Sequence, residues 1–462
     1  MKKMILMPQA KLSFYTKCCV LWLSLLATSL SSYAQYNWAK LNAAPYNGAK
    51  QDDIFFINKD TGWSVNGSGY IYRTNDGGTT WTAQLHKPST FFRCVGFVTD
   101  SLGFAGNIGT NYFPGVTDTV PLYRTTDGGI TWQPITNYTG PRVKGLCAIS
   151  IAKTPFINRG NLDHEVTIYA AGRVGSPAFL MKSTDRGQTW TSKDLSAYCA
   201  MITDVHFFNK DTGFVFGGTS GDIASSGAKI LYTTNGGETF SAVYTSTRTY
   251  EMIWKASFPS RKTGYATVLS YDNGNPNRYV AKTTDGGLTW TEIPLTNSGR
   301  KEFGIGFITD SIGWVGTDAN GYETTDGGTT WTNTTLGSYA NKIRTIKTTG
   351  GFVAYAIGLN VYKLSTLNSG LGELKKSNSL VIYPNPNSAK ELFIRFDNLG
   401  VNYTKIEVIN LQGKVATPTP VRVDEKTTKI DLSGFAAGTY TVKIYENGKV
   451  YTEKLIIGEV RP

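Results

Sequence analysis

A short pattern that recurs six times constrains the fold more than any other feature of this 462-residue chain. Its first copy reads T-N-D-G-G-T-T-W over residues 74–81, and every copy ends in an aromatic residue. Successive terminal aromatics lie 51, 58, 50, 50 and 41 residues apart; they are Trp81, Trp132, Trp190, Phe240, Trp290 and Trp331. A repeat of this length is that of one four-stranded blade of a β-propeller.

The acidic or amide residue of each copy is expected to close a tight turn; these residues are Asp76, Asp127, Asp185, Asn235, Asp285 and Asp326. Its side-chain oxygen can accept hydrogen bonds from backbone N–H groups two or three residues further on. The glycines that follow permit positive φ, and the terminal aromatic ring can pack against a neighbouring element. Because turn chemistry accounts for every position, we expect a structural role for the motif rather than a ligand site.

A second pattern precedes most copies and completes the unit. Its first example reads D-I-F-F-I-N-K-D-T-G-W over residues 53–63, which predicts a strand, a polar turn and a second strand. The last unit, residues 342–364, supplies three strands without an Asp turn, and residues 36–41 offer the missing fourth strand. Pairing the two ends would close the ring and remove its sheet edges. We therefore predict an all-β chain in which residues 35–365 form a seven-bladed β-propeller.

The combination of strand, D-x-x-G-W/F turn, strand and T-T-D-G-G-x-T-W turn resembles the Asp-box, or bacterial neuraminidase repeat, propellers. Within them it is most similar to the photosystem II assembly-factor branch. The resemblance covers about residues 36–365. It implies the fold, but it says little about activity because one fold carries many functions.

Residues 1–34 resemble a secretory signal peptide. Lysines precede a run of about 13 apolar residues from Cys18 to Leu30, and Ser32 and Ala34 are small residues at the positions that cleavage needs. The run is too short to span a hydrocarbon core of ~30 Å. No later stretch is apolar enough either, so we expect the mature chain to have no transmembrane segment.

The C-terminal region follows a polar, glycine-containing stretch, residues 366–378, which we expect to be a linker. Alternating strand patterns joined by turns predict a small immunoglobulin-like β-sandwich over residues 379–462. This region resembles the type A C-terminal sorting domain of type IX secretion; the matching residues are Tyr383, Pro384, Asn385, Pro386, Gly413, Gly438 and Tyr440. The resemblance implies the type IX machinery as a partner, and a secreted or outer-membrane surface location reached through the periplasm.

Charge and composition argue against several classes of partner. The formal net charge is +12, and removal of the four lysines of the predicted signal peptide leaves about +8, scattered without a basic run. We therefore expect no nucleic-acid partner. The three histidines lack metal-ligand spacing and no cofactor motif is present, so neither metal nor cofactor is expected. Cys94, Cys147 and Cys199 lie in apolar stretches, which favours buried free thiols and leaves one disulfide possible.

A glycoside hydrolase of sialidase type is the enzyme alternative, because sialidases share the Asp turns. Their sites resemble one another in three arginines for the substrate carboxylate, a Tyr–Glu nucleophile pair and an Asp acid. The Arg-Ile/Leu-Pro signature expected before the first Asp turn is absent, and residues 66–72 stand there instead. The sequence therefore favours a protein without catalytic activity.

A binding site is expected on the face opposite the Asp turns. Three connections on that face are enlarged, namely residues 107–121, 217–229 and 271–278. Residues just ahead of each blade's first strand should line the mouth of the central channel; the candidates are Asp53, Arg93, Asp204, Trp254, Lys255, Glu302 and Lys342. We predict a secreted or cell-surface binding module for a protein or glycan, with an assembly factor for an envelope complex as a further alternative.

Overall fold

A computed structural model describes most of the chain, and it divides into two compact units, Met1–Thr366 and Leu367–Pro462. The predicted signal peptide, the predicted linker, Pro386 and Gly413 lie outside the described residues. Those residues are 36–45, 50–158, 161–348, 351–365, 380–385, 387, 390–396, 403–410, 414–424, 426–446 and 449–458.

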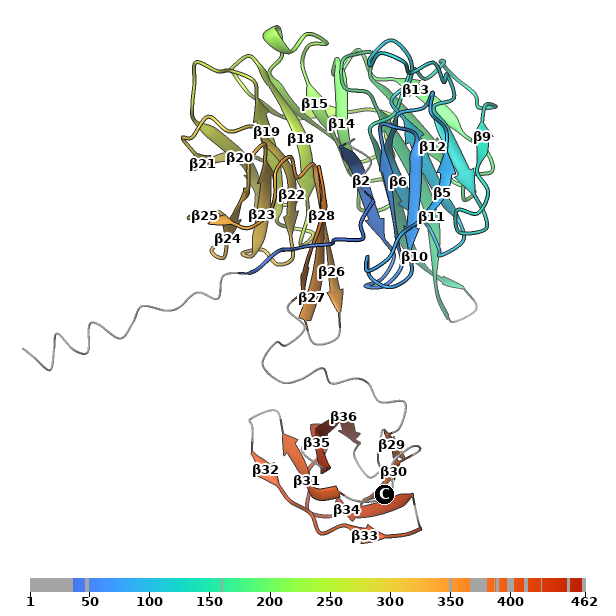
Figure 1. The fold of residues 1–462 in the computed structure, drawn as a ribbon, viewed down its shortest axis with the longest axis vertical. Coiled ribbons are helices and arrows are strands. Elements are labelled where there is room, and N and C mark those ends of the chain that lie inside the picture. Colours follow the sequence, from blue (N-terminus) through green and yellow to red (C-terminus); the bar gives the residue numbers. More distant parts are fainter. Residues whose placement is uncertain are drawn as a thin grey trace, which may run out of the picture. The chain divides into compact units, whose positions relative to one another are not determined.

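The described part of the first unit contains seven four-stranded antiparallel sheets, and six of them are built from consecutive strands. We number these six sheets as blades 1 to 6 in chain order (Figure 1). Their strands are β2–β5 (Gln51–Phe56, Gly62–Asn66, Tyr70–Thr74, Thr82–His86), β6–β9 (Phe92–Phe97, Gly103–Asn107, Leu122–Thr125, Gln133–Ile135), β10–β13 (Ala148–Asn158, Asn161–Gly172, Phe179–Ser183, Thr191–Asp194), β14–β17 (Met201–Phe207, Gly213–Gly218, Ala228–Thr233, Ser241–Thr245), β18–β21 (Glu251–Ser257, Gly264–Ser270, Arg278–Thr283, Thr291–Thr296) and β22–β25 (Glu302–Phe307, Gly313–Thr317, Gly321–Thr324, Thr332–Thr334).

Blade 7 joins the two ends of the unit. Its strands β26 (Lys342–Thr348), β27 (Gly351–Ile357) and β28 (Val361–Ser365) are completed by β1 (Ala39–Lys40), and Ala39 pairs with Lys363. The first strands of successive blades contact one another all the way round, and β26 contacts β2. The all-β fold is confirmed. The sheets form a closed ring, so each blade has a neighbouring blade on both of its faces.

Each Asp turn is held by side chains of its own motif. In the first turn, Asp76 Oδ1 accepts the Thr74 hydroxyl at 2.8 Å and the Thr80 backbone N–H at 2.9 Å. The backbone N–H that Asp76 accepts therefore lies four residues further along the chain, whereas the sequence predicted a distance of two or three residues. The turn is tight because Gly77 and Gly78 take φ values of 68° and 86°.

The aromatic residue that ends the motif also bonds within the turn. Trp81 Nε1 donates to the Gly78 carbonyl at 3.1 Å, and Trp132, Trp190 and Trp290 repeat this bond at 3.0 to 3.2 Å. Phe240 occupies the same place without a donor, beside a turn closed by Asn235. The motif thus fixes a hairpin, and its side-chain polar groups are largely consumed by the turn itself.

Four of the seven interfaces between blades share one arrangement, which we call the latch. A ring on the second strand of one blade stacks on a Phe of the next blade's first strand, with centroids 3.5 to 3.7 Å apart; the pairs are Trp63–Phe97, Tyr169–Phe207, Tyr265–Phe307 and Tyr355–Phe56. The same ring donates a hydrogen bond to a turn carbonyl of that next blade. A cation on the third strand donates to the first turn glycine; these cations are Arg73, Lys182, Lys282 and Lys363.

The other three interfaces use edge-on rings instead. The second-strand ring meets the terminal aromatic of the next Asp turn, or its counterpart in the closing strand; the pairs are Phe104–Trp190, Phe214–Trp290 and Trp314–Trp38. Their interplanar angles are 72°, 83° and 89°. Edge-to-face and offset-stacked pairs each add about 0.5–1.5 kcal/mol beyond area burial. Both interface types therefore contribute to holding the ring together.

The second unit is a β-sandwich of two four-stranded sheets. One sheet comprises β29 (Leu380–Tyr383), β30 (Glu391–Phe396), β34 (Thr427–Asp431) and β33 (Val421–Arg422); the other comprises β32 (Val415–Ala416), β31 (Tyr403–Asn410), β35 (Gly438–Glu446) and β36 (Lys449–Ile457). Leu392, Ile430, Val408 and Val442 from the two sheets pack in one core. Asn385 of the predicted sorting motif accepts from Ile456 N–H at 2.9 Å and donates to the Lys454 carbonyl at 2.6 Å. The motif therefore ties the first strand of the unit to its last.

The latch predicts a specific cost for removing one hydroxyl. The Tyr265 hydroxyl donates to the Asp310 carbonyl at 2.6 Å, so Tyr265→Phe keeps the stack and loses that bond. We expect a loss of about 1 kcal/mol in unfolding free energy, measured by urea denaturation. Tyr72→Phe is the control, because the Tyr72 hydroxyl has no hydrogen bond among the described residues. Equal losses in the two variants would contradict the latch.

The Asp turns predict acid sensitivity. Hydrogen bonds from the Thr131 side chain and backbone lower the pKa of Asp127 to about 2. A depressed pKa means that this carboxylate stabilises the fold above its unfolded pKa near 3.9, and that the contribution is lost as pH falls from about 4 to 2. Asp127→Asn should keep the turn, as Asn235 does, and shrink the drop in Tm between pH 6 and pH 2.5. Asp127→Ala should lower Tm at both pH values, and an unchanged pH dependence in Asp127→Asn would refute this account.

Candidate functional site

A cavity of about 760 Å³ opens on the side of the propeller where the first strands of the blades begin. All three enlarged connections reach it, through Tyr112 and Phe113, through Ile223, and through Tyr271. Its size lies in the ~300–1,000 Å³ range of ligand pockets. The loops that the sequence marked as enlarged therefore build its sides.

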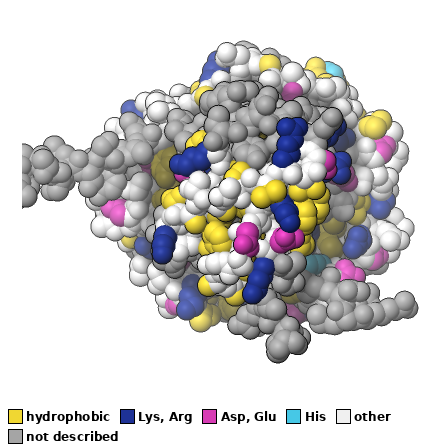
Figure 2. Space-filling view, turned by 90° about the horizontal axis from the view of Figure 1, so that it is seen from below, with side chains coloured by type: hydrophobic (Ala, Val, Ile, Leu, Met, Phe, Trp, Pro, Cys, Tyr) yellow, Lys and Arg dark blue, Asp and Glu magenta, His cyan; other side chains and the backbone are white. Residues whose placement is uncertain are grey.

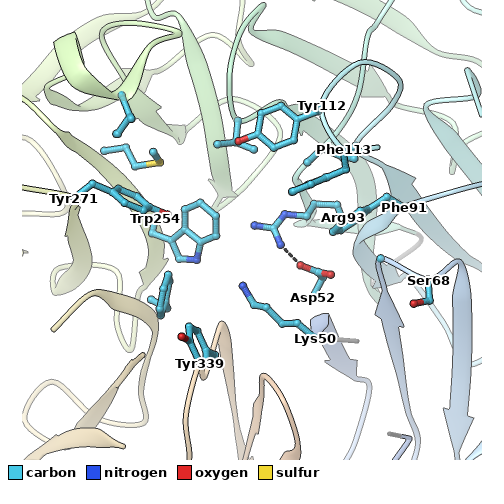
Figure 3. A pocket seen from close by; sticks show the side chains of 16 residues that line it. Lys50, Asp52, Ser68, Phe91, Arg93, Tyr112, Phe113, Trp254, Tyr271 and Tyr339 are labelled. Atoms are coloured by element: carbon cyan, nitrogen blue, oxygen red, sulfur yellow. Dashed lines mark hydrogen bonds and ion pairs between the residues drawn. The ribbon is translucent and has the colours of Figure 1, made fainter. Parts of the chain in front are cut away.

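Two groups of aromatic rings face each other across this cavity (Figure 3). The first wall consists of Phe91, Phe113 and Tyr112, with Phe113 stacked on Phe91 at 4.6 Å between centroids. The second wall consists of Trp254, Phe303 and Tyr339, with Phe303 6.2 Å from Trp254 and 6.0 Å from Tyr339. Tyr112, Phe113 and Tyr339 are 37%, 40% and 43% exposed, so both walls continue to the surface.

Three charged side chains, Lys50, Asp52 and Arg93, lie between the walls, and we call them the charged group (Figure 3). Arg93 and Asp52 form a buried ion pair, and the Arg93 guanidinium lies 4.9 Å from the Trp254 ring centroid. Burial opposes the charge on Arg93, but Asp52 outweighs it and raises the pKa of the guanidinium. Asp52 is therefore committed to Arg93.

Lys50 is held differently. Its ammonium donates to Asn341 Oδ1 at 3.0 Å and lies 5.3 Å from the Phe303 ring centroid. Burial lowers the pKa of Lys50 to about 8, although Asp52 acts in the opposite sense. Asn341 also accepts the Trp254 indole N–H at 2.9 Å, so a single amide positions both the ammonium and the second wall.

Of the seven predicted mouth residues, Arg93 and Trp254 line this cavity and the other five do not. Asp53 accepts Val95 N–H at 3.0 Å and lies 3.7 Å from Arg344. Asp204 lies between Lys342 at 3.3 Å and Lys255 at 3.9 Å, inside the channel. Asp53 and Asp204 thus take part in ion pairs with Arg344, Lys342 and Lys255 inside the channel.

Glu302 does not line the cavity either. Its side chain is fully buried and its carboxylate is 3.5 Å from Arg278. Burial raises the pKa of Glu302 well above its ordinary value, even though Arg278 acts against this. The residue belongs to the packing between β20 and β22, and it offers no group to a ligand in the cavity.

Irregular strand pairing explains why Asp53 was predicted to line the mouth of the channel, whereas Asp52 lines the cavity. The pairing of first and second strands shifts register between Gln51 and Asp53, and again between Phe92 and Cys94. A bulge places two residues opposite one and breaks the alternation of side chains between faces. Asp52 and Phe303 lie at such register shifts and were missed. Lys50, Phe91 and Tyr339 were missed too; they lie in the connections one to three residues ahead of β2, β6 and β26.

A Tyr–Glu pair does exist, but it lies elsewhere. Tyr244 on β17 donates to Glu292 on β21, and Arg248 donates to the same carboxylate at 2.7 and 3.0 Å. Neither strand is the first strand of its blade, and none of the three side chains lines the cavity. Among the described lining residues, Asp52 is the one carboxylate. The three-arginine arrangement of a sialidase site is not assembled by these residues.

A second cavity of about 330 Å³ lies at the other ends of the first strands, lined by Asp204, Lys342, Arg344 and His206 among others. Burial lowers the pKa of His206 to about 4, and its ring stacks on Phe258 with centroids 4.7 Å apart. Burial also lowers the pKa of Lys342 to about 8. Asp204 and Lys342 are paired with each other here, and Arg344 donates to the Ile54 carbonyl.

Metal ligands and surface charge are two further features of the described part of the chain. That part holds no group of three His, Cys, Asp or Glu side chains able to bind a metal ion, and Cys94, Cys147 and Cys199 are buried free thiols. On the face drawn in Figure 2, Lys and Arg side chains are interspersed with Asp and Glu side chains. The coloured side chains in that view form no patch of a single sign.

Comparison with known families identifies the tail. The family described as secretion system C-terminal sorting domain matches residues 381–458. The chain carries a type IX sorting domain. That domain indicates export to the cell surface or into the medium, and it implies contact with the type IX machinery. In the part of the chain that the structure describes, no helix has the length and apolar character to cross a membrane.

The first unit matches the BNR/Asp-box repeat family over residues 123–134. Among solved structures, YCF48 from Cyanidioschyzon merolae is 18% identical, with 72% of this chain and 100% of that chain covered and a TM-score of 0.49. An ancestral GH74 enzyme is 13% identical, with 91% and 64% covered and a TM-score of 0.51. The extracellular domain of a putative one-component system from B. thetaiotaomicron is 9% identical, with 90% and 54% covered and a TM-score of 0.52.

These likenesses show the fold alone, and the chain spans less than two thirds of the last two structures. No curated protein matches the chain. The comparisons therefore support an exported Asp-box propeller, and the chemistry of its cavity has to be argued from its own residues.

The ion pair in the cavity predicts an asymmetric response to mutation. Asp52→Ala leaves Arg93 buried without its partner, which costs about 3–5 kcal/mol in pairs of this kind. The double variant Asp52→Ala with Arg93→Met should recover a large part of that loss, because no charge is then left unpaired. Urea denaturation of the wild type, the two single variants and the double variant measures the coupling. Additive losses would show that the pair is not coupled.

Proposed function

We propose that the propeller is the ligand-binding module of an exported protein, and that its ligand enters the cavity between the two aromatic walls. One observation carries this proposal: the described lining is rich in aromatic rings and contains a single carboxylate, which Arg93 already neutralises. Aromatic groups supply contact area at low entropic cost, and a few polar groups set orientation. That combination suits recognition of a protein segment or a glycan.

Hydrolysis of glycosides is less well supported by the same residues. Two-carboxylate mechanisms need an acid and a base or nucleophile about 5–9.5 Å apart. Asp52 has no second carboxylate beside it among the described lining residues, and the Tyr244–Glu292 pair lies on fourth strands outside the cavity. An assembly factor for an envelope complex would use the same cavity to bind a protein, so it is a special case of the binding proposal.

The experiment combines a glycan array, a peptide array and a fluorogenic glycoside panel, with the purified protein as probe. Tyr339→Ala and Phe113→Ala remove exposed rings from opposite walls, and each should weaken binding about tenfold. Tyr250→Ala is a matched control, because Tyr250 is 41% exposed, shares a positive φ with Tyr339 and does not line the cavity.

Two results would contradict the proposal. Glycoside turnover that Tyr339→Ala or Phe113→Ala abolishes would make the cavity an active site. Binding that neither variant weakens would place the ligand on another surface of the molecule.

A further inference from the structure

Lys50 brings a positive charge to the cavity that no carboxylate of the described residues pairs with at ion-pair distance. Its ammonium has one hydrogen-bond acceptor, Asn341 Oδ1, and forms no ion pair with a carboxylate of the described residues. The nearest acid, Asp52, is held by Arg93. Lys50 is partly buried, and a cation that is removed from water without a paired counter-charge loses solvation free energy. A ligand anion at this place would supply what the protein does not.

The remaining polar groups of the cavity are hydroxyls. Tyr112, Tyr271 and Tyr339 line it, and no hydrogen bond joins their phenolic oxygens to another described residue. A phenol can both donate and accept a hydrogen bond. Three such groups around a cation suit a ligand that carries hydroxyls of its own as well as a negative charge.

The walls set the shape of the ligand. Phe91 and Phe113 on one side and Trp254 and Phe303 on the other present apolar surface across the cavity. Sugar rings have apolar C–H faces and hydroxyl edges, so they can pack on such walls while their edges reach the tyrosines. The formal charges of Lys50, Arg93 and Asp52 sum to one positive charge. That sum favours one anionic group on the sugar ring that lies in the cavity.

We propose that the cavity binds an acidic saccharide, with its carboxylate or sulfate group on Lys50 and its rings between the two aromatic walls. This inference rests on the proposed function, and it names the ligand class for the same cavity. A carboxylate and a sulfate share the chemistry that Lys50 recognises, and the experiment separates them.

The test measures the affinity of the full chain for matched oligosaccharides by calorimetry. Oligogalacturonates are compared with galactose oligomers of equal length, and sulfated galactose oligomers with their unsulfated forms. We expect at least one acidic set to bind about tenfold or more tightly than its neutral match. Lys50→Gln should remove that preference and Lys50→Arg should retain most of it. Lys301→Gln removes a charge 4.8 Å from the Tyr271 ring, outside the cavity lining, and should change affinity less than about twofold.

The pH profile gives an independent readout. Lys50 must be protonated to hold an anion, and its pKa is about 8 with Asp52, Arg93 and Lys255 as its charged neighbours. Affinity for the acidic set should therefore fall between pH 6.5 and pH 9.5, and Lys50→Gln should flatten that profile. If Lys50→Gln fails to fold, Tyr112→Phe and Tyr339→Phe keep the proposal testable, because each removes one hydroxyl from a partly exposed ring that lines the cavity and should weaken saccharide binding.

The outcomes separate the two proposals. Two results would overturn the acidic saccharide proposal and leave the binding-module proposal standing. In the first, neutral and acidic oligosaccharides bind equally tightly; in the second, only peptides bind. In both, Tyr339→Ala must weaken the binding. Binding of an acidic set that Lys50→Gln and the tyrosine variants do not weaken overturns it as well. Absence of any ligand that depends on the cavity overturns both.

Discussion

The latch between blades is the interaction on which the propeller depends. A stacked pair of rings, a hydrogen bond and a cation all converge on turns of the next blade, as in Tyr355 and Lys363 against blade 1. Latches and edge-on contacts alternate along the chain from blade 1 to blade 7. Seven is odd, so strict alternation cannot continue round a closed ring, and two latches meet at blade 1. The latch between blade 7 and blade 1, formed by Tyr355 and Phe56, belongs to the blade in which the two ends of the unit pair through β1.

A closed ring fixes where the first strands begin, and that decides what kind of cavity can form. Asp53 and Asp204 each accept a backbone N–H of the next blade, from Val95 and from Ala256, and thereby join neighbouring blades deep in the channel. Their carboxylates are paired with cations there. These carboxylates and their cations therefore stabilise the channel. The charged group near the mouth is left to contact the proposed ligand.

The predicted signal peptide and the sorting domain frame this propeller in the sequence, and the sorting domain is a folded unit with its own core. Asn385 links the first and last strands of that domain, so the residues that carry the sorting resemblance also hold its termini in place. The sorting domain and the proposed binding cavity therefore reside in separate units, and substitutions in the cavity can be made without touching the sorting motif.

The sequence by itself determined the fold, because its evidence was local and repeated. Asp76 and its five counterparts mark turns whose chemistry lies within eight residues, and Trp38 carries a strand-end pattern that identifies the closing strand. The cavity was only partly accessible in this way: Arg93, Trp254 and the enlarged loops were named, whereas Lys50 and Asp52 were not. The reason is physical. Bulges at the starts of the first strands break the two-residue alternation, as at Gln51–Asp53 and at Glu302–Ile305. Only packing against neighbouring blades decides which side chain then faces the channel, which one is buried, and which one is left for a ligand.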